Sequence, residues 1–182
     1  TGSEALMGTT SGLSMAPYIR EGRRIIGRPA YGQEEFMIRE QDLRNDLAGG
    51  RDFSATTIGL THYDIDIHGC KYRNDEEPFE ASSAGTASYF VQPLQVPLES
   101  LIPVGIDNLL IGGKSLAVSH IANAMTRIHQ GEWIIGAAAG TTAGWLLRYG
   151  QPEDLTPAQI VTTGQMGDLQ QFLRDSGLRL AW

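Results

Sequence analysis

The sequence has little cysteine and no excess of basic residues, and both shortages exclude classes of protein. Cys70 is the one cysteine, so the chain forms no internal disulfide and no cysteine-based zinc site, which needs two to four thiolates. The 14 lysines and arginines are outnumbered by 21 aspartates and glutamates, which gives a net charge of −7. A protein that binds nucleic acid through phosphates needs a basic surface. We therefore expect neither a metal site nor a nucleic-acid partner.

Long hydrophobic runs are also lacking. The least polar stretch extends from Trp133 to Leu147 and is shorter than the ~20 residues of a membrane-spanning helix. No basic segment followed by an apolar run marks a signal peptide near the start. We expect a cytoplasmic protein without a membrane span. Since the chain begins at Thr1 and not at Met, we also expect either that its start was removed or that it is a part of something longer.

Disorder is excluded by composition, because hydrophobic residues make up 41% of the chain and charged residues only 19%. Glycine is abundant, with 22 in 182 residues, well above the usual share of roughly 7%. Glycines in such numbers mark turns or places where the backbone approaches another group closely.

Apolar periodicity predicts an alternation of strands and helices, which is typical of an α/β chain or, for a fragment, an α+β chain. The alternation in 63–68 predicts a strand with one buried face, and the apolar run 108–111 predicts a buried strand that ends at Gly112 and Gly113. Further strands are predicted over 23–28 and 35–38 and, short or at an edge, within 89–102. Helices are predicted over 39–47, over 130–147, from Pro157 and over 167–176, the last ending at Gly177.

The predicted helix over 130–147 contains Gly136, Gly140 and Gly144, which share one helix face. Each glycine costs a helix about 0.8–1 kcal/mol relative to alanine, so close packing must compensate. A membrane dimer face is disfavoured by the length of the run and by Glu132 and Arg148 at its ends. Two interpretations stay open: a glycine face packed on a sheet, and a helix that packs on a sheet and directs its N-terminal amides at an electron-accepting ligand.

Several segments, in this order, resemble FAD-dependent oxidoreductases. The resemblance covers nearly the whole chain and extends to the closing helix at 169–180. Its motifs are Pro-Tyr-Ile-Arg-Glu-Gly-Arg-Arg at 17–24, Asp-Ile-Asp-Ile-His at 64–68, Asn-Leu-Leu-Ile-Gly-Gly-Lys at 108–114, Ser-His-Ile-Ala at 119–122, Met-Thr-Arg-Ile at 125–128 and Gly-Ala-Ala-Ala-Gly-Thr at 136–141.

The resemblance implies the C-terminal portion of a glutathione-reductase-like fold. Residues 1–97 would belong to a β-rich substrate domain, 98–150 to the C-terminal segment of the FAD-binding domain, with its strand and its Gly/Ala-rich helix facing FAD, and 151–182 to a helical tail. No G-x-G-x-x-G motif occurs in the sequence, although this motif holds the dinucleotide phosphates in a Rossmann domain. FAD would therefore be shared with a Rossmann-containing half that precedes this chain or lies on another chain.

The resemblance also implies roles for individual residues. Gly112, Gly113 and Lys114 would approach the ribityl or phosphate region of FAD. The start of the long helix would face the pyrimidine edge of the flavin, with His129, Gln130, Gly131, Glu132 and Trp133 as candidates. A carboxylate at Glu132 is expected to oppose negative charge on the reduced flavin.

His120 and Arg127 are the candidate catalytic residues on the substrate side of the flavin. The alternatives are a partly buried structural histidine at 120 and an ion pair between Arg127 and Glu132. Arg20, Arg23 and Arg24 suit either an anionic substrate or a salt-bridge network, while His68 and Cys70 are expected to be structural and without a redox role, respectively.

These observations predict the C-terminal half of an FAD-dependent oxidoreductase, which transfers hydride or electrons to or from a small-molecule substrate. The alternative is a non-catalytic interaction module that kept the fold and lost the flavin, because the dinucleotide motif is not in the sequence. In that case the face that meets the Rossmann half would bind another protein.

Overall fold

The structure is a computed structural model that describes residues 36–66, 90–150 and 155–182. Four predictions lie outside these residues: the strand over 23–28, the three arginines at 20, 23 and 24, His68 and Cys70. The described part is a mixture of helices with a small two-stranded sheet, which agrees with the α/β class.

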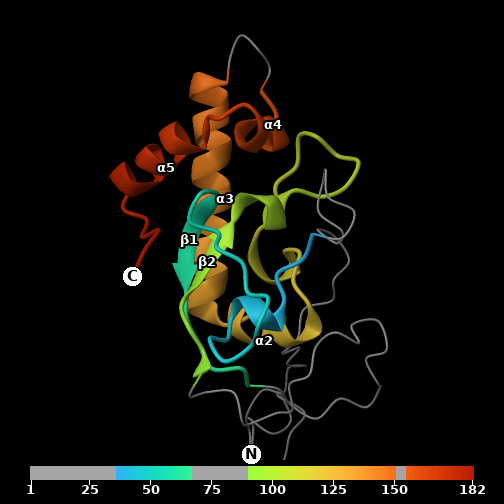
Figure 1. Ribbon diagram of the computed structural model, residues 1–182. Helices are drawn as coiled ribbons and strands as arrows, with labels where there is room; N and C mark the ends of the chain where they lie inside the picture. Colours follow the sequence, from blue (N-terminus) through green and yellow to red (C-terminus); the bar gives the residue numbers. More distant parts are fainter. Residues whose placement is uncertain (1–35, 67–89, 151–154) are drawn as a thin grey trace, which may run out of the picture.

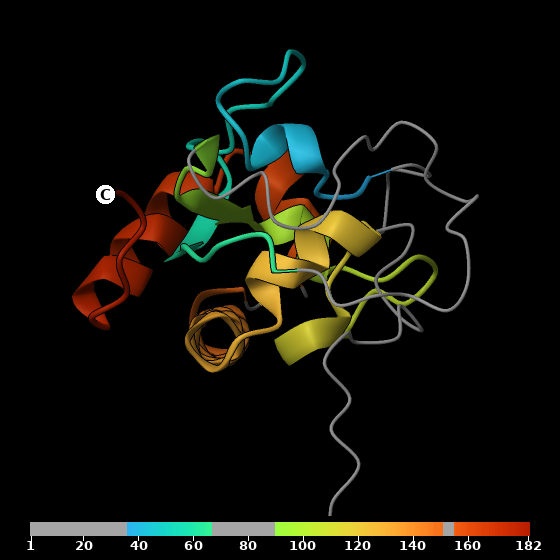
Figure 2. The same ribbon diagram turned by 90° about the horizontal axis from the view of Figure 1, so that it is seen from below.

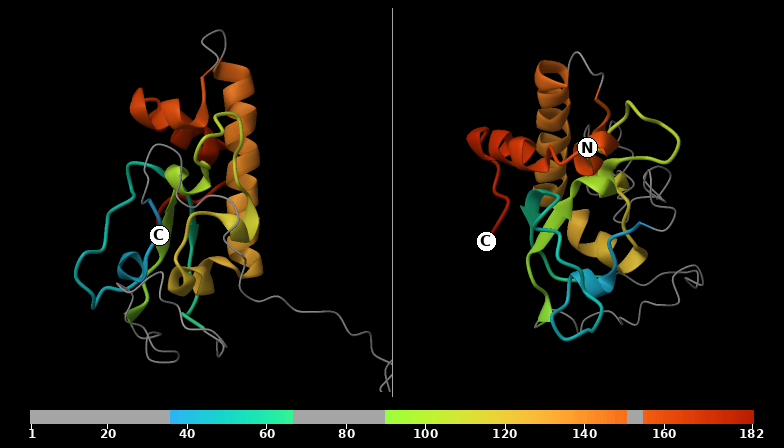
Figure 3. Two further views of the ribbon diagram at one scale, coloured as in Figure 1. Left: turned by 90° about the vertical axis from the view of Figure 1, so that its right-hand side faces the viewer. Right: turned by 45° about the horizontal axis from the view of Figure 1, so that its top comes forward.

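The long helix α3 (His129–Tyr149) forms one side of the molecule, and the other elements pack along it (Figure 1). Strands β1 (Thr57–Thr61) and β2 (Leu94–Pro97) pair antiparallel, and β1 lies against α3. Helix α2 (His120–Thr126) lies near the start of α3, and helices α4 (Pro157–Thr162) and α5 (Met166–Asp175) lie near its end (Figure 3).

Three single-turn 3-10 helices complete the described elements: η1 (Glu40–Asp42), η3 (Leu98–Leu101) and η4 (Gly113–Ser115). The predicted helix over 39–47 is reduced to η1. The predicted strand over 35–38 is reduced to one parallel bridge, Ile38 to Val118, with the Ile38 amide donating to the Ala117 carbonyl at 2.9 Å.

The C-terminal helices follow the prediction closely. Thr156 is the N-cap of α4 and accepts from the Gln159 amide, and Pro157 occupies the first helical position, where its missing N–H costs nothing. Leu169 and Leu173 of α5 are fully buried, and Gly177 just after the helix has φ 89°, which glycine adopts without strain. The Gln170 side chain donates to the carbonyls of Ser54 and Thr57, so α5 is fastened to the start of β1.

Two strand predictions are wrong. Residues 62–66 form no strand, and the strand β1 lies just before them, because that segment has β2 beside it to pair with. Residues 108–111 also form no strand: Leu109 is 36% exposed, and only Ile111 is both buried and bonded, donating its amide to the Leu101 carbonyl at 2.8 Å. An apolar segment becomes a strand only when another strand satisfies its backbone groups.

Gly136, Gly140 and Gly144 lie on the exposed side of α3, contrary to the prediction that they pack on a sheet. The buried positions of the helix are Gly131, Ile135, Ala138, Thr142 and Trp145, which recur every three or four residues. Gly136, Gly140 and Gly144 are exposed, and a Cβ at any of them would meet nothing within 4 Å. The prediction that these glycines pack on a sheet of this chain is therefore wrong for the described residues.

The close approach between sheet and helix comes instead from a glycine of the sheet. A Cβ at Gly59 in β1 would lie 2.5 Å from the Ile134 Cγ2 atom of α3. Figure 2 looks nearly along α3, and no described element covers its lower left side in that view. We call this uncovered side the outer face of α3; its members are Trp133, Gly136, Gly140, Ala143, Gly144 and Leu147.

Candidate functional site

Three segments with predicted site residues converge near the start of α3: the loop that carries η4, helix α2 and the first turn of α3. Gly112 lies beside α3, since a Cβ there would be 3.8 Å from the Cα atom of Gly136. The Asn123 side chain in α2 donates to the Lys114 carbonyl at 3.2 Å. The Lys114 Nζ atom lies 3.3 Å from Glu132 Oε1 in α3. One lysine thus links all three segments.

The Lys114–Glu132 pair changes the electrostatics expected of this site. Glu132 alone would place a negative charge in the first turn of α3. Lys114 compensates this charge at 3.3 Å, and both side chains remain about 30% exposed. The expected alternative of an ion pair between Arg127 and Glu132 is not formed. Glu132 pairs with Lys114, and the carboxylate near Arg127 among the described residues is that of Asp66.

The amide end of α3 has no cap. Its N-cap residue is Ile128, whose side chain offers no acceptor. In the part of the chain that the structure describes, the amides of His129, Gln130 and Gly131 have no hydrogen-bond acceptor. These are the free N–H groups that give a helix N-terminus its partial positive charge. A 21-residue helix therefore presents unsatisfied donors next to the η4 loop.

Gly131 is required by the tight connection between α2 and α3. A Cβ at this position would lie 2.6 Å from the Thr126 carbonyl oxygen, closer than real contacts allow. Gln130 supports the same turn, since its side chain donates to the His62 carbonyl at 2.6 Å. These two residues thus hold the amide end in place, whereas His129 is exposed and Trp133 is 78% exposed.

The two predicted catalytic residues lie at opposite ends of α2. His120 is the first residue of the helix and is partly buried. Arg127 is the C-cap residue, 7% exposed, and its guanidinium donates to the Asp66 carbonyl at 2.9 Å, with the Asp66 carboxylate 3.7 Å away. Seven residues of helix separate them by roughly 10 Å. Arg127 therefore lies at the α3 end of α2, and His120 lies at the far end.

Sequence reasoning missed Asn123, which is 2% exposed and joins α2 to the η4 loop. A polar side chain within the otherwise apolar run of α2 was the available signal, because a buried amide needs a partner.

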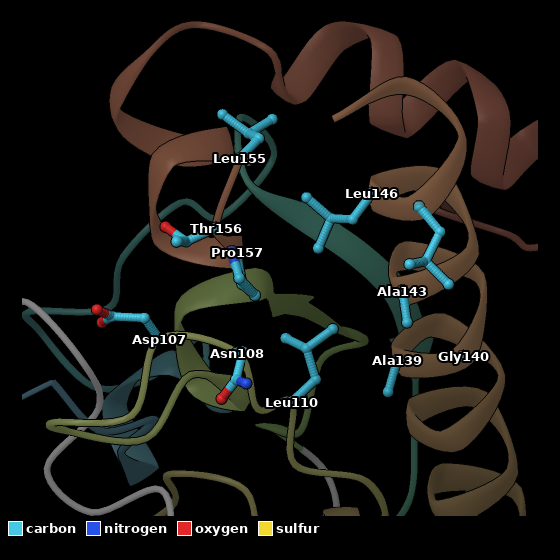
Figure 4. Close-up of a pocket in the computed structure, with 11 residues that line it drawn as sticks. Asp107, Asn108, Leu110, Ala139, Gly140, Ala143, Leu146, Leu155, Thr156 and Pro157 are labelled. Atoms are coloured by element: carbon cyan, nitrogen blue, oxygen red, sulfur yellow. The ribbon is translucent and has the colours of Figure 1, made fainter. Parts of the chain in front are cut away.

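A large pocket lies elsewhere among the described residues. It has a volume of about 610 Å³ and is lined by the 107–110 segment, the second half of α3 and the start of α4 (Figure 4). Leu110, Leu146 and Leu155 reach toward it, and Asp107, Asn108 and Thr156 add polar groups. On α3 the pocket begins at Ala139, ten residues from His129, or roughly 15 Å along the axis. It is therefore separate from the amide end.

A polar cavity of about 570 Å³ between 41–53 and 92–95 contains two arginines that are already engaged. Arg51 pairs with Asp42 and lies over the rings of Phe36 and Phe53. Arg44 pairs with Asp46 and Glu40, which raises the pKa of Arg44 further above its ordinary value. Neither guanidinium is available as an anion site.

The described residues contain no group of three or more histidine, cysteine, aspartate or glutamate side chains placed to hold a metal ion. No helix among them is long and apolar enough to cross a membrane.

The family model described as "FAD dependent oxidoreductase" matches residues 3–170. The chain belongs to this family. No curated protein and no solved structure matches the chain. The general function is thus that of an FAD-dependent oxidoreductase, and the cofactor that the family implies is FAD.

Three features of the amide end of α3 are compatible with the FAD that the family of this oxidoreductase implies. The electron-rich edge of a flavin needs hydrogen-bond donors, and three free amides are present there. The backbone is also uncovered at Gly113 and Gly136, where a Cβ would meet nothing within 4 Å. The Lys114–Glu132 pair leaves no uncompensated negative charge beside the donors.

Proposed function

We propose that this chain is the C-terminal half of an FAD-dependent oxidoreductase and needs a nucleotide-binding Rossmann half for hydride or electron transfer. In this arrangement 98–150 completes the FAD-binding domain, 1–97 contributes to a β-rich substrate domain of the glutathione-reductase-like type, and 151–182 forms a helical tail. The observation that carries the proposal is the outer face of α3, an apolar helix side on which Trp133 is 78% and Leu147 79% exposed.

The 107–110 segment supports the same proposal. Its apolar residues are Leu109 and Leu110; it lies beside the pocket at the outer side of α3 and has no strand partner among the described residues. A strand from the nucleotide-binding half would satisfy its backbone groups, and the same half would cover the helix. A contiguous apolar surface of this kind is typical of an interaction site.

FAD would supply the redox chemistry, and the residues of this chain would bind and orient it. The amides of His129, Gln130 and Gly131 would donate to the pyrimidine edge, where negative charge develops on reduction. Gly112, Gly113 and Lys114 would approach the ribityl or phosphate region, and Glu132 would hold Lys114 there. His120 and Arg127 would lie on the side of the small-molecule substrate.

The role of the amide end is tested with two substitutions at one residue. Proline is well tolerated at the first position of a helix, and Ile128 already has the extended conformation that a following proline requires (φ −74°, ψ 157°). His129→Pro therefore removes one amide donor, whereas His129→Ala removes only the side chain. In the native protein with its nucleotide-binding half, we expect His129→Pro to lower the flavin reduction potential and His129→Ala to leave it nearly unchanged. Equal potentials in the two variants would place the flavin elsewhere.

The role of the outer face is tested with two glycines. Gly144 in α3 and Gly167 in α5 are both exposed and helical, with nothing within 4 Å of a Cβ. We expect Gly144→Leu to weaken association with the nucleotide-binding half by about tenfold or more, because overpacking costs about 1–3 kcal/mol. Gly167→Leu should have no effect on association. If both variants associate normally, the outer face is not the interface.

The alternative is an interaction module without flavin, and the same outer face favours it equally. Mass and visible absorbance of the purified native protein separate the two. Bound flavin supports the oxidoreductase, whereas a colourless assembly whose formation still depends on Gly144 supports the module.

A further inference from the structure

A third surface pocket lies between the end of α3 and α5, away from the amide end. Its volume is about 390 Å³, and it is lined by Trp145, Tyr149, Gln165, Asp168, Gln171, Phe172 and Asp175. Nothing in the proposed flavin chemistry uses these residues. The lining combines three aromatic rings with two carboxylates and contains no lysine or arginine.

The rings form a connected aromatic wall. The ring centres of Trp145 and Tyr149 are 6.0 Å apart, and those of Tyr149 and Phe172 are 5.8 Å apart with planes at 77°. Trp145 is 4% exposed and therefore fixed by the core, while Tyr149 is 48% exposed. The Arg148 guanidinium lies 5.2 Å from the Tyr149 ring centre. Cations are attracted to ring faces at such distances, and this ring already attracts one.

The carboxylates are placed along one side of α5. Asp168 lies in its first turn, where the helix dipole favours a negative charge, so helix stability alone explains it. Asp175 is the last residue of α5, where the dipole disfavours a negative charge. Gln171 nevertheless holds it in place, donating to Asp175 Oδ1 at 2.8 Å. This i,i+4 bond offsets part of the unfavourable dipole interaction, and it holds the carboxylate beside the rings that line the pocket.

We propose that this pocket binds a small organic cation with an alkylated ammonium group. The aromatic wall would contact the methyl groups, which carry the spread positive charge, and Asp168 and Asp175 would supply the compensating negative charge. A metal ion or a primary amine would interact mainly with the carboxylates, whereas an alkylated ammonium group also uses the aromatic wall, which is the feature that selects it. The site does not depend on flavin binding.

The test compares choline with 3,3-dimethylbutanol, the neutral molecule of the same shape in which carbon replaces the charged nitrogen. Both are titrated into the full chain while its tryptophan indole and backbone amide signals are followed by NMR. We expect the Trp145 indole and the α5 amides to shift with choline, and the indoles of Trp133 and Trp182, both largely exposed, to stay in place. Equal binding of the neutral molecule, or equal shifts at all three tryptophans, would overturn the proposal.

Variants then identify the groups that bind. Tyr149→Leu should weaken choline binding by roughly threefold to tenfold, the range of a partly desolvated cation–π contact. Asp168→Asn should weaken it by a smaller factor that disappears at high salt. Tyr63→Leu is the matched control, since Tyr63 is exposed to a similar degree, 41%, and does not line the pocket. A Tyr149→Leu chain that folds and binds choline with unchanged affinity would also overturn the proposal.

Discussion

The two sides of α3 are both apolar, yet only one of them is covered. On the inner side Ile135 and Ala138 are 0% exposed and Trp145 is 4% exposed. On the outer face Trp133 and Leu147 are 78% and 79% exposed. Both sides of the helix are apolar enough to be buried, but the described part of the chain packs against only one of them. Hydrophobicity indicates that a side is to be buried and does not identify what buries it.

The sizes of the residues differ between the sides as well. The inner side carries the branched and aromatic residues that fill space between α3, the sheet and α5. The outer face carries three glycines between Trp133 and Leu147, which leave the backbone open to close approach. The inner side is suited to side-chain packing, and the outer face is suited to a partner whose backbone or rings come near the helix.

The largest expected effect is a difference in the free energy of unfolding between substitutions on the inner side and on the outer face of α3. Ile135→Ala should lower the free energy of unfolding by about 2–5 kcal/mol, because it leaves a cavity in a fully packed position. Leu147→Ala should change it by no more than about 0.5 kcal/mol, as exposed substitutions do. Denaturant unfolding of the isolated chain measures both. Comparable losses would mean that the outer face is already packed, and the comparison would fail.

An intermediate effect is expected from alanine at two glycines of the same helix. Gly131→Ala places a Cβ against the Thr126 carbonyl and should destabilise the chain by about 1–3 kcal/mol. Gly140→Ala meets open space and should stabilise the isolated chain by about 0.8–1 kcal/mol through helix propensity. Thermal unfolding measures both variants, and we expect Gly131→Ala to lower the melting temperature and Gly140→Ala to raise it. A lower melting temperature for both variants would contradict the difference between the two sides of α3.

The smallest effect is expected at the border between the sides, in the Lys114–Glu132 pair. Glu132→Gln should cost at most about 1 kcal/mol, since both partners are partly exposed. The cost should vanish in high salt, because screening weakens such pairs. Unfolding at low and high ionic strength gives this difference. A large loss that is insensitive to salt would show that the carboxylate has a second, buried role.

Much of the helical part could be predicted from the sequence, since caps and periodicity are local. Thr156 with Pro157 and the Leu169–Leu173 spacing sufficed for α4 and α5. The convergence of Lys114 and Glu132 near the start of α3 agrees with placing both in one predicted site, although their direct pairing was not predicted. The functional roles of these residues remain predictions.

The strands and the glycine face could not be predicted, because each depends on a neighbour that is distant or missing. The 63–68 alternation matched a strand in pattern, but β2 pairs with 57–61 instead. The 108–111 run has strand composition without a strand beside it among the described residues. The glycine spacing indicated a close approach, and no local signal states whether this chain or another group makes it.

The contact of Gln170 with Ser54 and Thr57 has a consequence for synthesis. The two carbonyls precede the glutamine by 116 and 113 positions, so the start of β1 cannot be fastened before Gln170 has been synthesised and α5 has formed. Contacts this remote in sequence slow folding. Until α5 has formed, the parts of α3 and β1 that it contacts are exposed to solvent.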